Sequence, residues 1–240
     1  MLRRTLMLVF AMLASVAFAQ TQRTPEQVAA EYRNLPWQMG PGSADVAGKG
    51  TLKLGKEDAF LGTEGAKKLL SLMGNPPTDG HYAVVPTTND NWVGVFTFDP
   101  SGYVTDDDAI DADALLATLM ETNQRNNEER KRLGLSGLHL QGWYATPRYD
   151  KGRKRLEWGT KLVNDGGGIV VNYTTRILGR TGVMHTVLIS DPSHLDADRR
   201  AFAQRLEGFE FVPSEKYSEF REGDKVAGYG LAALVAGGAA

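Results

Sequence analysis

The chain contains no cysteine among its 240 residues. Disulfides, thiolate metal sites, thiol nucleophiles and thiol redox chemistry are therefore excluded, and packing alone must hold the fold together. The chain also lacks an excess of either charge, because 27 Lys and Arg side chains stand against 29 Asp and Glu side chains. Without a basic field to attract phosphates, nucleic acid is not an expected partner.

The first residues carry the pattern of an export signal. Arg3 and Arg4 precede an apolar run over residues 6–18, and Ala17-Phe18-Ala19 supplies the small residues that a signal peptidase needs. This run is shorter than the about 20 residues needed to cross a bilayer, which favours cleavage over an uncleaved anchor. We therefore expect residues 1–19 to be removed and the mature protein to reach the periplasm.

The mature chain of about 220 residues suits one domain with an appendage at each end. Residues 20–48 contain three prolines and show little periodicity, which predicts an N-terminal arm with one short helix starting at Pro25. Residues 49–222 are predicted to form the folded domain. Residues 223–240 form a Gly- and Ala-rich apolar tail, too short to span a bilayer. We expect this tail to give weak membrane association and to add little to the core.

Apolar spacing predicts an α+β fold. Period-two alternation predicts a mainly antiparallel meander whose strands, separated by Gly-rich turns, cover residues 138–147, 155–163, 168–178 and 183–190. Shorter strands are predicted at residues 50–54, 81–85, 92–98 and 209–212. Helical spacing predicts helices over residues 63–73, 112–133 and 195–206. Because one face of the meander is apolar, we expect two or three helices to cover it.

An acidic run precedes the longest predicted helix, with carboxylates at Asp106, Asp107, Asp108, Asp111 and Asp113. Such a run could suit Ca²⁺, which takes oxygen ligands. The EF-hand pattern fails, however, because its sixth and twelfth positions, counted from Asp106, hold Asp111 and Ala117 instead of Gly and Glu. Carboxylates are also favoured at helix starts, with Asp111 as the N-cap. We favour capping over cation binding or a partner contact, and expect no metal site.

Catalytic patterns are incomplete throughout the sequence. The four histidines lack metal-site spacing, although His139 and His185 lie in predicted strands and could meet across a sheet. No Gly-x-Ser-x-Gly elbow is present, and the glycines after Asp165 precede a strand, as in a hairpin turn. A glycosidase pair would need Asp107 or Asp108 to face Glu157. The sequence therefore favours a protein without catalytic residues or cofactors.

Aromatic residues supply the remaining candidates for a binding surface. Strand aromatics such as Trp92, Trp143, Tyr144, Trp158 and Tyr173 fall on alternating positions, which favours a core over a ligand platform. The residues we select as candidates for binding combine aromatic and acidic side chains: Trp92, Tyr103, Asp106, Asp107, Asp108, Trp143 and Tyr149.

Several stretches carry a family resemblance, among them Asn91-Trp-Val-Gly-Val-Phe-Thr-Phe, Ser101-Gly-Tyr-Val-Thr-Asp-Asp-Asp-Ala, the segment from Val171 to Val183 and the tail from Lys225. With these, the chain resembles a bacterial family of uncharacterised membrane-anchored envelope proteins. The resemblance implies a signal peptide, an envelope domain and a C-terminal segment that opens a membrane helix. It implies no reaction. The helix of residues 195–206 leading into Phe209 is similar to extrinsic photosystem-subunit sandwiches, which implies a fold only.

We therefore expect a non-catalytic envelope protein that is exported to the periplasm and associated with the inner membrane. Its expected partner is another envelope protein or a membrane component. A periplasmic small-molecule or metal-binding module is the alternative, followed by an unrecognised hydrolase. An exposed aromatic or apolar patch would favour binding, whereas a pocket with perturbed titratable groups would favour an enzyme.

Overall fold

The structure is a computed structural model that describes residues 24–88 and 92–236. The predicted leader and its cleavage site lie outside the described residues. The helices are α2 (Pro25–Arg33), α3 (Thr63–Leu72), α4 (Ala112–Arg132), α5 (Leu195–Leu206), α6 (Leu231–Ala236) and the 3-10 helix η1 (Tyr217–Glu219). The strands are β1 (Gln38–Met39), β2 (Gly42–Val46), β3 (Gly50–Leu54), β4 (Asp58–Leu61), β5 (His81–Pro86), β6 (Val93–Asp99), β7 (Leu138–Asp150), β8 (Arg155–Asn164), β9 (Ile169–Leu178), β10 (Val183–Ser190) and β11 (Phe209–Phe211).

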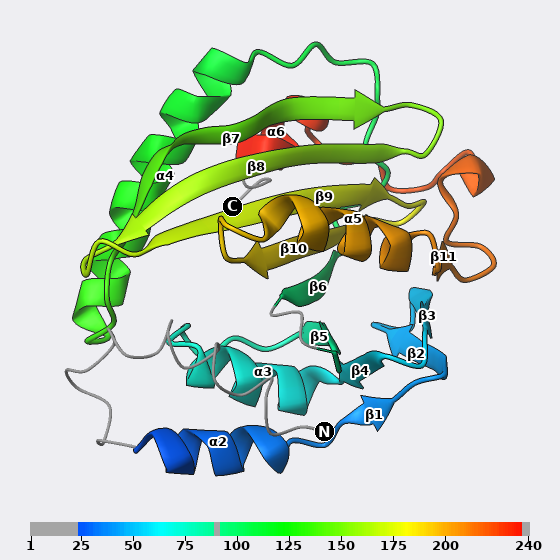
Figure 1. Ribbon diagram of the computed structural model, residues 1–240. Coiled ribbons are helices and arrows are strands. Elements are labelled where there is room, and N and C mark those ends of the chain that lie inside the picture. Colours follow the sequence, from blue (N-terminus) through cyan, green and yellow to red (C-terminus); the bar gives the residue numbers. More distant parts are fainter. Residues whose placement is uncertain (1–23, 89–91, 237–240) are drawn as a thin grey trace.

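Two antiparallel sheets confirm the predicted α+β fold (Figure 1). The larger has eight strands in the order β1-β4-β5-β6-β10-β9-β8-β7, and the smaller has the order β11-β3-β2. Strands β7 to β10 form the predicted meander, each pairing with the next along the chain. The meander then joins the N-terminal strands through the β10–β6 pair, whose register places Val187 opposite Val95.

Helices cover both faces of the large sheet. Helix α5 and the small sheet cover one face, where Phe202 and Leu206 pack with sheet residues such as Phe96 and Met184. Helix α3 covers β4 to β6 on the other face, and α4 and α6 cover the meander there, behind the strands in Figure 1. Alternation along β8 separates the two sides, since Leu156 and Trp158 face α6 while Glu157, between them, faces α5.

The predicted N-terminal arm is wrong for residues 38–39 and 42–46, which form strands β1 and β2. Strand β1 pairs with β4, and β2 pairs with β3. Ala44 and Val46 on β2 are 1% and 0% exposed and belong to the main core. Strand β1 has two residues, and β2 has only Ala44 and Val46 as apolar residues, so no period-two pattern of large apolar side chains marks either strand. The short helix predicted at Pro25 is confirmed as α2, with Thr24 as its N-cap.

The expectation that the C-terminal tail adds little to the core is also wrong. Leu231, Leu234 and Val235 of α6 are each 1% exposed and pack beneath α4. Their spacing places all three on one side of the helix, and the neighbouring Ala232 and Ala236 are half-buried against the same cluster. In the part of the chain that the structure describes, no helix is long and apolar enough to cross a membrane.

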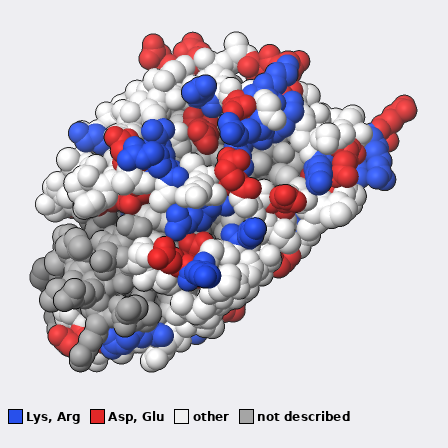
Figure 2. Space-filling model, turned by 45° about the vertical axis from the view of Figure 1, so that its right-hand side comes forward, with Lys and Arg blue, Asp and Glu red and all other residues white. Residues whose placement is uncertain are grey.

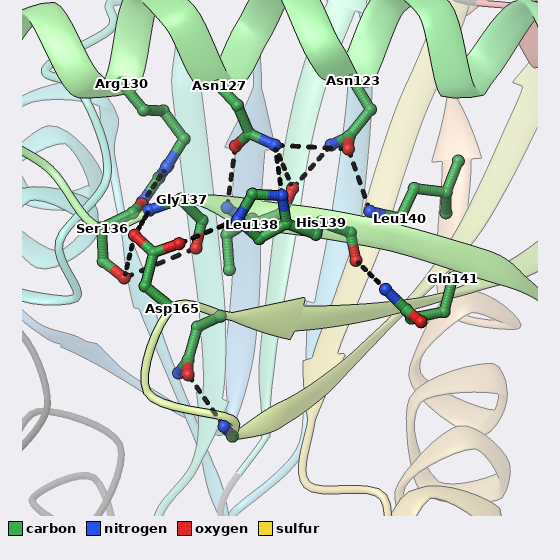
Figure 3. A network of polar contacts seen from close by, with 12 residues as sticks. Asn123, Asn127, Arg130, Ser136, Gly137, Leu138, His139, Leu140, Gln141 and Asp165 are labelled. Atoms are coloured by element: carbon green, nitrogen blue, oxygen red, sulfur yellow. Dashed lines mark hydrogen bonds and ion pairs between the residues drawn. The ribbon is translucent and has the colours of Figure 1, made fainter.

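Two asparagines of α4 bind the outer edge of β7 (Figure 3). The amide oxygen of Asn127 accepts from the backbone N–H of Leu138 at 2.8 Å, and its Nδ2 donates to the Leu138 carbonyl at 2.9 Å. Asn123 accepts from the N–H of Leu140 at 2.9 Å and donates to the same carbonyl at 2.7 Å. Helix residues four apart lie about 6 Å from each other, close to the two-residue repeat of a strand. The helix thus supplies the hydrogen bonds that a ninth strand would make.

Candidate functional site

Three of the candidate binding residues meet on the face of the sheet that α4 and α6 cover. Tyr103 and Asp106 come from the loop between β6 and α4, and Tyr149 comes from the end of β7. They are joined by Lys154 from the β7–β8 hairpin and by two residues of the segment after β11. We call this set the tyrosine–aspartate cluster, which comprises Tyr103, Asp106, Tyr149, Lys154, Tyr217 and Phe220.

Asp106 is the polar centre of the cluster. Its Oδ2 accepts a hydrogen bond from the Tyr149 hydroxyl at 2.7 Å and another from Lys154 Nζ at 2.7 Å. The side chains of Asp106 and Lys154 are 15% and 29% exposed, so this ion pair is largely shielded from water. Lys154 Nζ also lies 4.7 Å from the centre of the Tyr217 ring. Lys154 adopts a φ of 54°, a left-handed conformation uncommon for a residue with a side chain.

The electrostatics of the cluster fix its protonation state. Burial alone would raise the pKa of Asp106, but the hydrogen bonds from Lys154 and Tyr149 outweigh it and the pKa lies below its usual range. Burial raises the pKa of Tyr149 and of Tyr217, and the neighbouring hydroxyl and carboxylate groups raise both further. At neutral pH the carboxylate is charged and both hydroxyls stay protonated. Such groups suit recognition better than acid–base catalysis, which needs a pKa near the working pH.

The aromatic rings of the cluster are stacked and partly open to solvent. The ring centre of Tyr103 lies 4.4 Å from that of Tyr217 and 4.3 Å from that of Phe220. Phe220 is 41% exposed, and Val226, which bridges to the backbone of Tyr103, is 49% exposed. These residues form an exposed apolar patch, the feature that favours binding over catalysis.

Side-chain contacts hold the loops that carry this patch. Arg180 donates from Nε and Nη2 to the two carboxylate oxygens of Asp224, each at 2.6 Å, and these bonds lower the pKa of Asp224 to about 2. The Tyr217 hydroxyl donates to the carbonyl of Val104 at 2.9 Å. The patch is therefore formed before any partner arrives, which reduces the entropy cost of binding.

The other candidate residues lie apart from this centre. Trp92 is 1% exposed and packs 5.6 Å from the Phe202 ring beneath α5, on the opposite face of the sheet. Trp143 packs into the core under α4, with its indole N–H donating to the carbonyl of Ala112 at 3.2 Å. Asp107 is exposed, and Asp108 lies over Gly230, where any Cβ would meet its carboxylate.

Sequence reasoning missed half of the cluster. Lys154 lies among other charged residues of the β7–β8 hairpin, and nothing in the sequence distinguishes it from them. Tyr217 and Phe220 lie in a segment for which no element was predicted. The available signal was the presence of two large aromatic rings in an otherwise polar stretch, Ser214-Glu-Lys-Tyr-Ser-Glu-Phe-Arg. Aromatic residues outside any apolar pattern are themselves typical of binding surfaces.

Helix capping at the acidic run is confirmed, because Asp111 accepts from the backbone N–H groups of Asp113 and Ala114 at 3.1 Å. Within residues 24–88 and 92–236, no group of three or more His, Asp or Glu residues could hold a metal ion. Glu157 faces α5, so it does not face Asp107 or Asp108 as the glycosidase hypothesis required.

The two strand histidines do not meet either, since β8 and β9 separate their strands. His139 instead pairs with Asp165 at 2.8 Å, near the protein surface. Burial and the neighbouring Arg176 lower the pKa of His185 to about 3, so this ring is neutral at ordinary pH.

The fold and this site define an α+β sheet protein with an exposed aromatic patch and, in the described residues, no metal-binding group. The chain belongs to the family described as protein of unknown function (DUF2167), which matches residues 38–240. No curated protein matches it.

Two solved structures are similar to the chain. Cyanobacterial PsbP (CyanoP) from Synechocystis sp. has a TM-score of 0.42 and 13% identity, over 74% of this chain and 94% of that chain. A Pseudomonas aeruginosa protein of unknown function, PA94, has a TM-score of 0.29 and 20% identity, over 52% of this chain and 76% of that chain. At these TM-scores neither likeness bears on the function of this chain.

Proposed function

We propose that the chain is a non-catalytic envelope protein that binds another protein through the tyrosine–aspartate cluster. The observation that carries this proposal is the contact between the half-buried ring of Tyr103 and the exposed ring of Phe220, beside Val226, which is 49% exposed. Rigid aromatic rings bury much area at little entropy cost, which is why Tyr and other large aromatics dominate the energetics of protein interfaces. The shielded Asp106–Lys154 pair adds a polar centre that orients a partner.

The charges around the patch favour a protein partner over a lipid surface. Next to Phe220 lie Arg221 and Glu222, next to Val226 lies Lys225, and next to Asp106 lies Asp107. An anionic bilayer attracts clusters of basic residues, and this rim carries both signs. Figure 2 likewise shows acidic and basic side chains interspersed over the visible face. A mixed rim is typical of protein interfaces.

The compartment is part of the proposal. The leader pattern of residues 1–19 and the family resemblance support export to the periplasm, with association at the inner membrane. The large apolar side chains of α6, Leu231, Leu234 and Val235, are buried against the core. We therefore assign the expected partner to the envelope and the main binding surface to the cluster.

A photo-crosslinking amino acid placed at position 220 in the full chain tests the proposal in the bacterial envelope. We expect one discrete protein adduct, and we expect Tyr103→Ala to remove it because the stacked ring is lost. The matched control carries the same crosslinker at position 133, where Leu133 is 45% exposed at the end of α4. Equal adducts at both positions, or adducts with lipid alone at position 220, would contradict a protein-binding patch.

A further inference from the structure

A second site lies on the opposite face of the sheet, between α5 and strands β8 and β9. It is a cavity of about 180 Å³. Its floor comes from Glu157 on β8 and from Tyr173 and Thr175 on β9. The register pairs Glu157 with Thr175, and Tyr173 is two residues away on the same face, so the three side chains point together toward the helix.

Helix α5 forms the wall of the cavity. Arg199 and Arg200 lie at one end, and Phe202, Ala203 and Leu206 lie toward the other. Phe202 and Leu206 are 1% exposed and belong to the core, so the apolar end is rigid. Ala203 is exposed and leaves the mouth open to solvent. A polar end with both charges and a small apolar end are thus combined in one cavity that is open to solvent on one side.

The opposite charges of this cavity do not neutralise each other. The Tyr173 hydroxyl donates to Glu157 Oε2 at 3.2 Å, and no Lys or Arg of the described residues forms an ion pair with Glu157. The Arg199 side chain is 43% exposed and lies 4.0 Å from Asp196. Its guanidinium lies 5.4 Å from the centre of the Tyr173 ring, and its hydrogen bond with the Tyr173 hydroxyl raises the pKa of Arg199. Its Nε is buried and has no hydrogen-bond partner. A buried donor without a partner costs stability unless a ligand or water completes it.

The size of the cavity limits what can complete it. A single water needs only about 10–15 Å³ of such space, so the cavity is large enough for a small molecule of a few non-hydrogen atoms. Drug-sized ligands need pockets of about 300 Å³ or more. A single anion would pair with the arginines but leave Glu157 facing a second negative charge. A single cation would pair with Glu157 but leave Arg199 facing a second positive charge.

We propose that this cavity binds a small zwitterion, an α-amino acid of the size of alanine. Its ammonium group contacts Glu157, its carboxylate contacts Arg199 and Arg200, and its side chain packs toward Ala203 and Leu206. This site is independent of the protein-binding patch, because the sheet lies between them.

Titration of the full chain with alanine, followed by backbone amide NMR shifts, tests the proposal. We expect saturable shifts confined to α5, β8 and β9. Acetate and methylammonium each carry one of the two charges, and we expect each to bind at least about tenfold more weakly than alanine. Acetate binding as tightly as alanine would overturn the proposal in favour of a simple anion site, and the absence of saturable shifts with alanine would overturn it outright.

Variants locate the site. Glu157→Gln and Arg199→Gln should each weaken alanine binding by about tenfold or more. The matched controls Glu210→Gln and Arg125→Gln, both exposed and outside the cavity, should bind as the unchanged protein does. Ala203→Met keeps all the charges and narrows the mouth at an exposed position, so it tests the site even where a charge variant fails to fold. Unchanged binding in Glu157→Gln or Ala203→Met would overturn the proposal.

Discussion

Individual carboxylates fix the loops that carry the aromatic patch, and each depends on a specific basic partner. Asp106 is bound by Lys154 and Tyr149, and Asp224 is bound by Arg180 through two parallel hydrogen bonds. A planar guanidinium facing a carboxylate in this way gives geometric specificity as well as attraction. The patch should therefore depend on the ionisation of these acids.

Asp224→Asn tests this dependence through pH. The pKa of Asp224 is lowered to about 2 in the folded protein, chiefly by the hydrogen bond from Arg180, against about 3.9 in an unfolded chain. A depressed pKa stabilises the fold above the unfolded value, and this contribution is lost as the pH falls toward the folded value. We expect the variant to melt below the unchanged protein at pH 6 and the two melting temperatures to converge near pH 2.

The control for this experiment is Asp107→Asn, since Asp107 is exposed. Its melting temperature should follow that of the unchanged protein at every pH. A difference between Asp224→Asn and the unchanged protein that stays constant from pH 6 to pH 2 would show that the contact acts through packing and not through charge.

Side-chain hydrogen bonds were predictable from the sequence where the two residues that form them are close along the chain. The N-cap role of Asp111 follows from its position before a helical pattern and needs contacts only two and three residues away. The pairing of Asp106 with Lys154 joins residues 48 positions apart, and Arg180 reaches Asp224 over 44. No local pattern carries such pairs, because the turn of the β7–β8 hairpin and the path after β11 bring them together.

At the scale of elements, the hydrogen bonds between α4 and β7 give a direct prediction. Asn127→Ala removes both of its bonds to Leu138 and leaves the half-buried N–H of Leu138 without this acceptor, while the Leu138 carbonyl keeps the bond from Asn123. We expect a loss of about 1–3 kcal/mol in the free energy of unfolding, the cost of an unsatisfied polar group. The amides of Leu138 and Leu140 should exchange faster with solvent, which hydrogen-exchange NMR measures. Asn126→Ala, at an exposed neighbouring position, should change neither quantity.

Helix α6 gives a second prediction about an element. Leu234→Ala should lower the free energy of unfolding by about 2–5 kcal/mol, because it removes a fully buried side chain and leaves a cavity under α4. Urea denaturation measures the change. Leu133→Ala, at a position 45% exposed, should cost about 0.5 kcal/mol or less. Equal, small effects would mean that the tail is not docked in solution.

Elements were predictable where their apolar residues follow a visible period. The long helices α4 and α5 and the strands β7 to β10 extend over enough residues for their period to be visible. Strand β4 was missed because all four of its residues are buried, which removes the alternation that marks a strand. The tail that contains α6 was expected to associate weakly with a membrane and to add little to the core, because small and apolar residues look alike in either role.

For the whole molecule, the order of strands in the meander was predictable, whereas its junction with the N-terminal half was not. Short Gly-rich turns make β7 to β10 neighbours in sequence order. Strands β6 and β10 are separated along the sequence by α4 and three strands, and no short turn between them predicts that they pair. The cavity beneath α5 depends on β8, β9 and a helix that follows them, so it also required the three-dimensional structure.

Export is the prediction that concerns the chain as a whole. Intact-mass analysis of protein purified from the bacterial envelope should show a mature form that begins at Gln20, because Ala17-Phe18-Ala19 follows a basic and apolar leader. Ala19→Glu, which places a charged residue at the cleavage position, should leave the leader attached. A chain that retains Met1 in the unmodified protein would contradict the prediction.

The position of α6 has a consequence for the order in which the protein is made. Leu231 and Leu234 of α6 pack against Leu156, Leu178 and Val183 of the meander. The ribosome adds α6 after every strand of the sheet. Until then α4 alone covers that face of the meander, and the contacts of α6 that complete it are of long sequence separation, which slows folding. The nascent chain therefore remains incompletely packed through most of its synthesis, the condition in which a polypeptide can still be threaded through a narrow translocation channel.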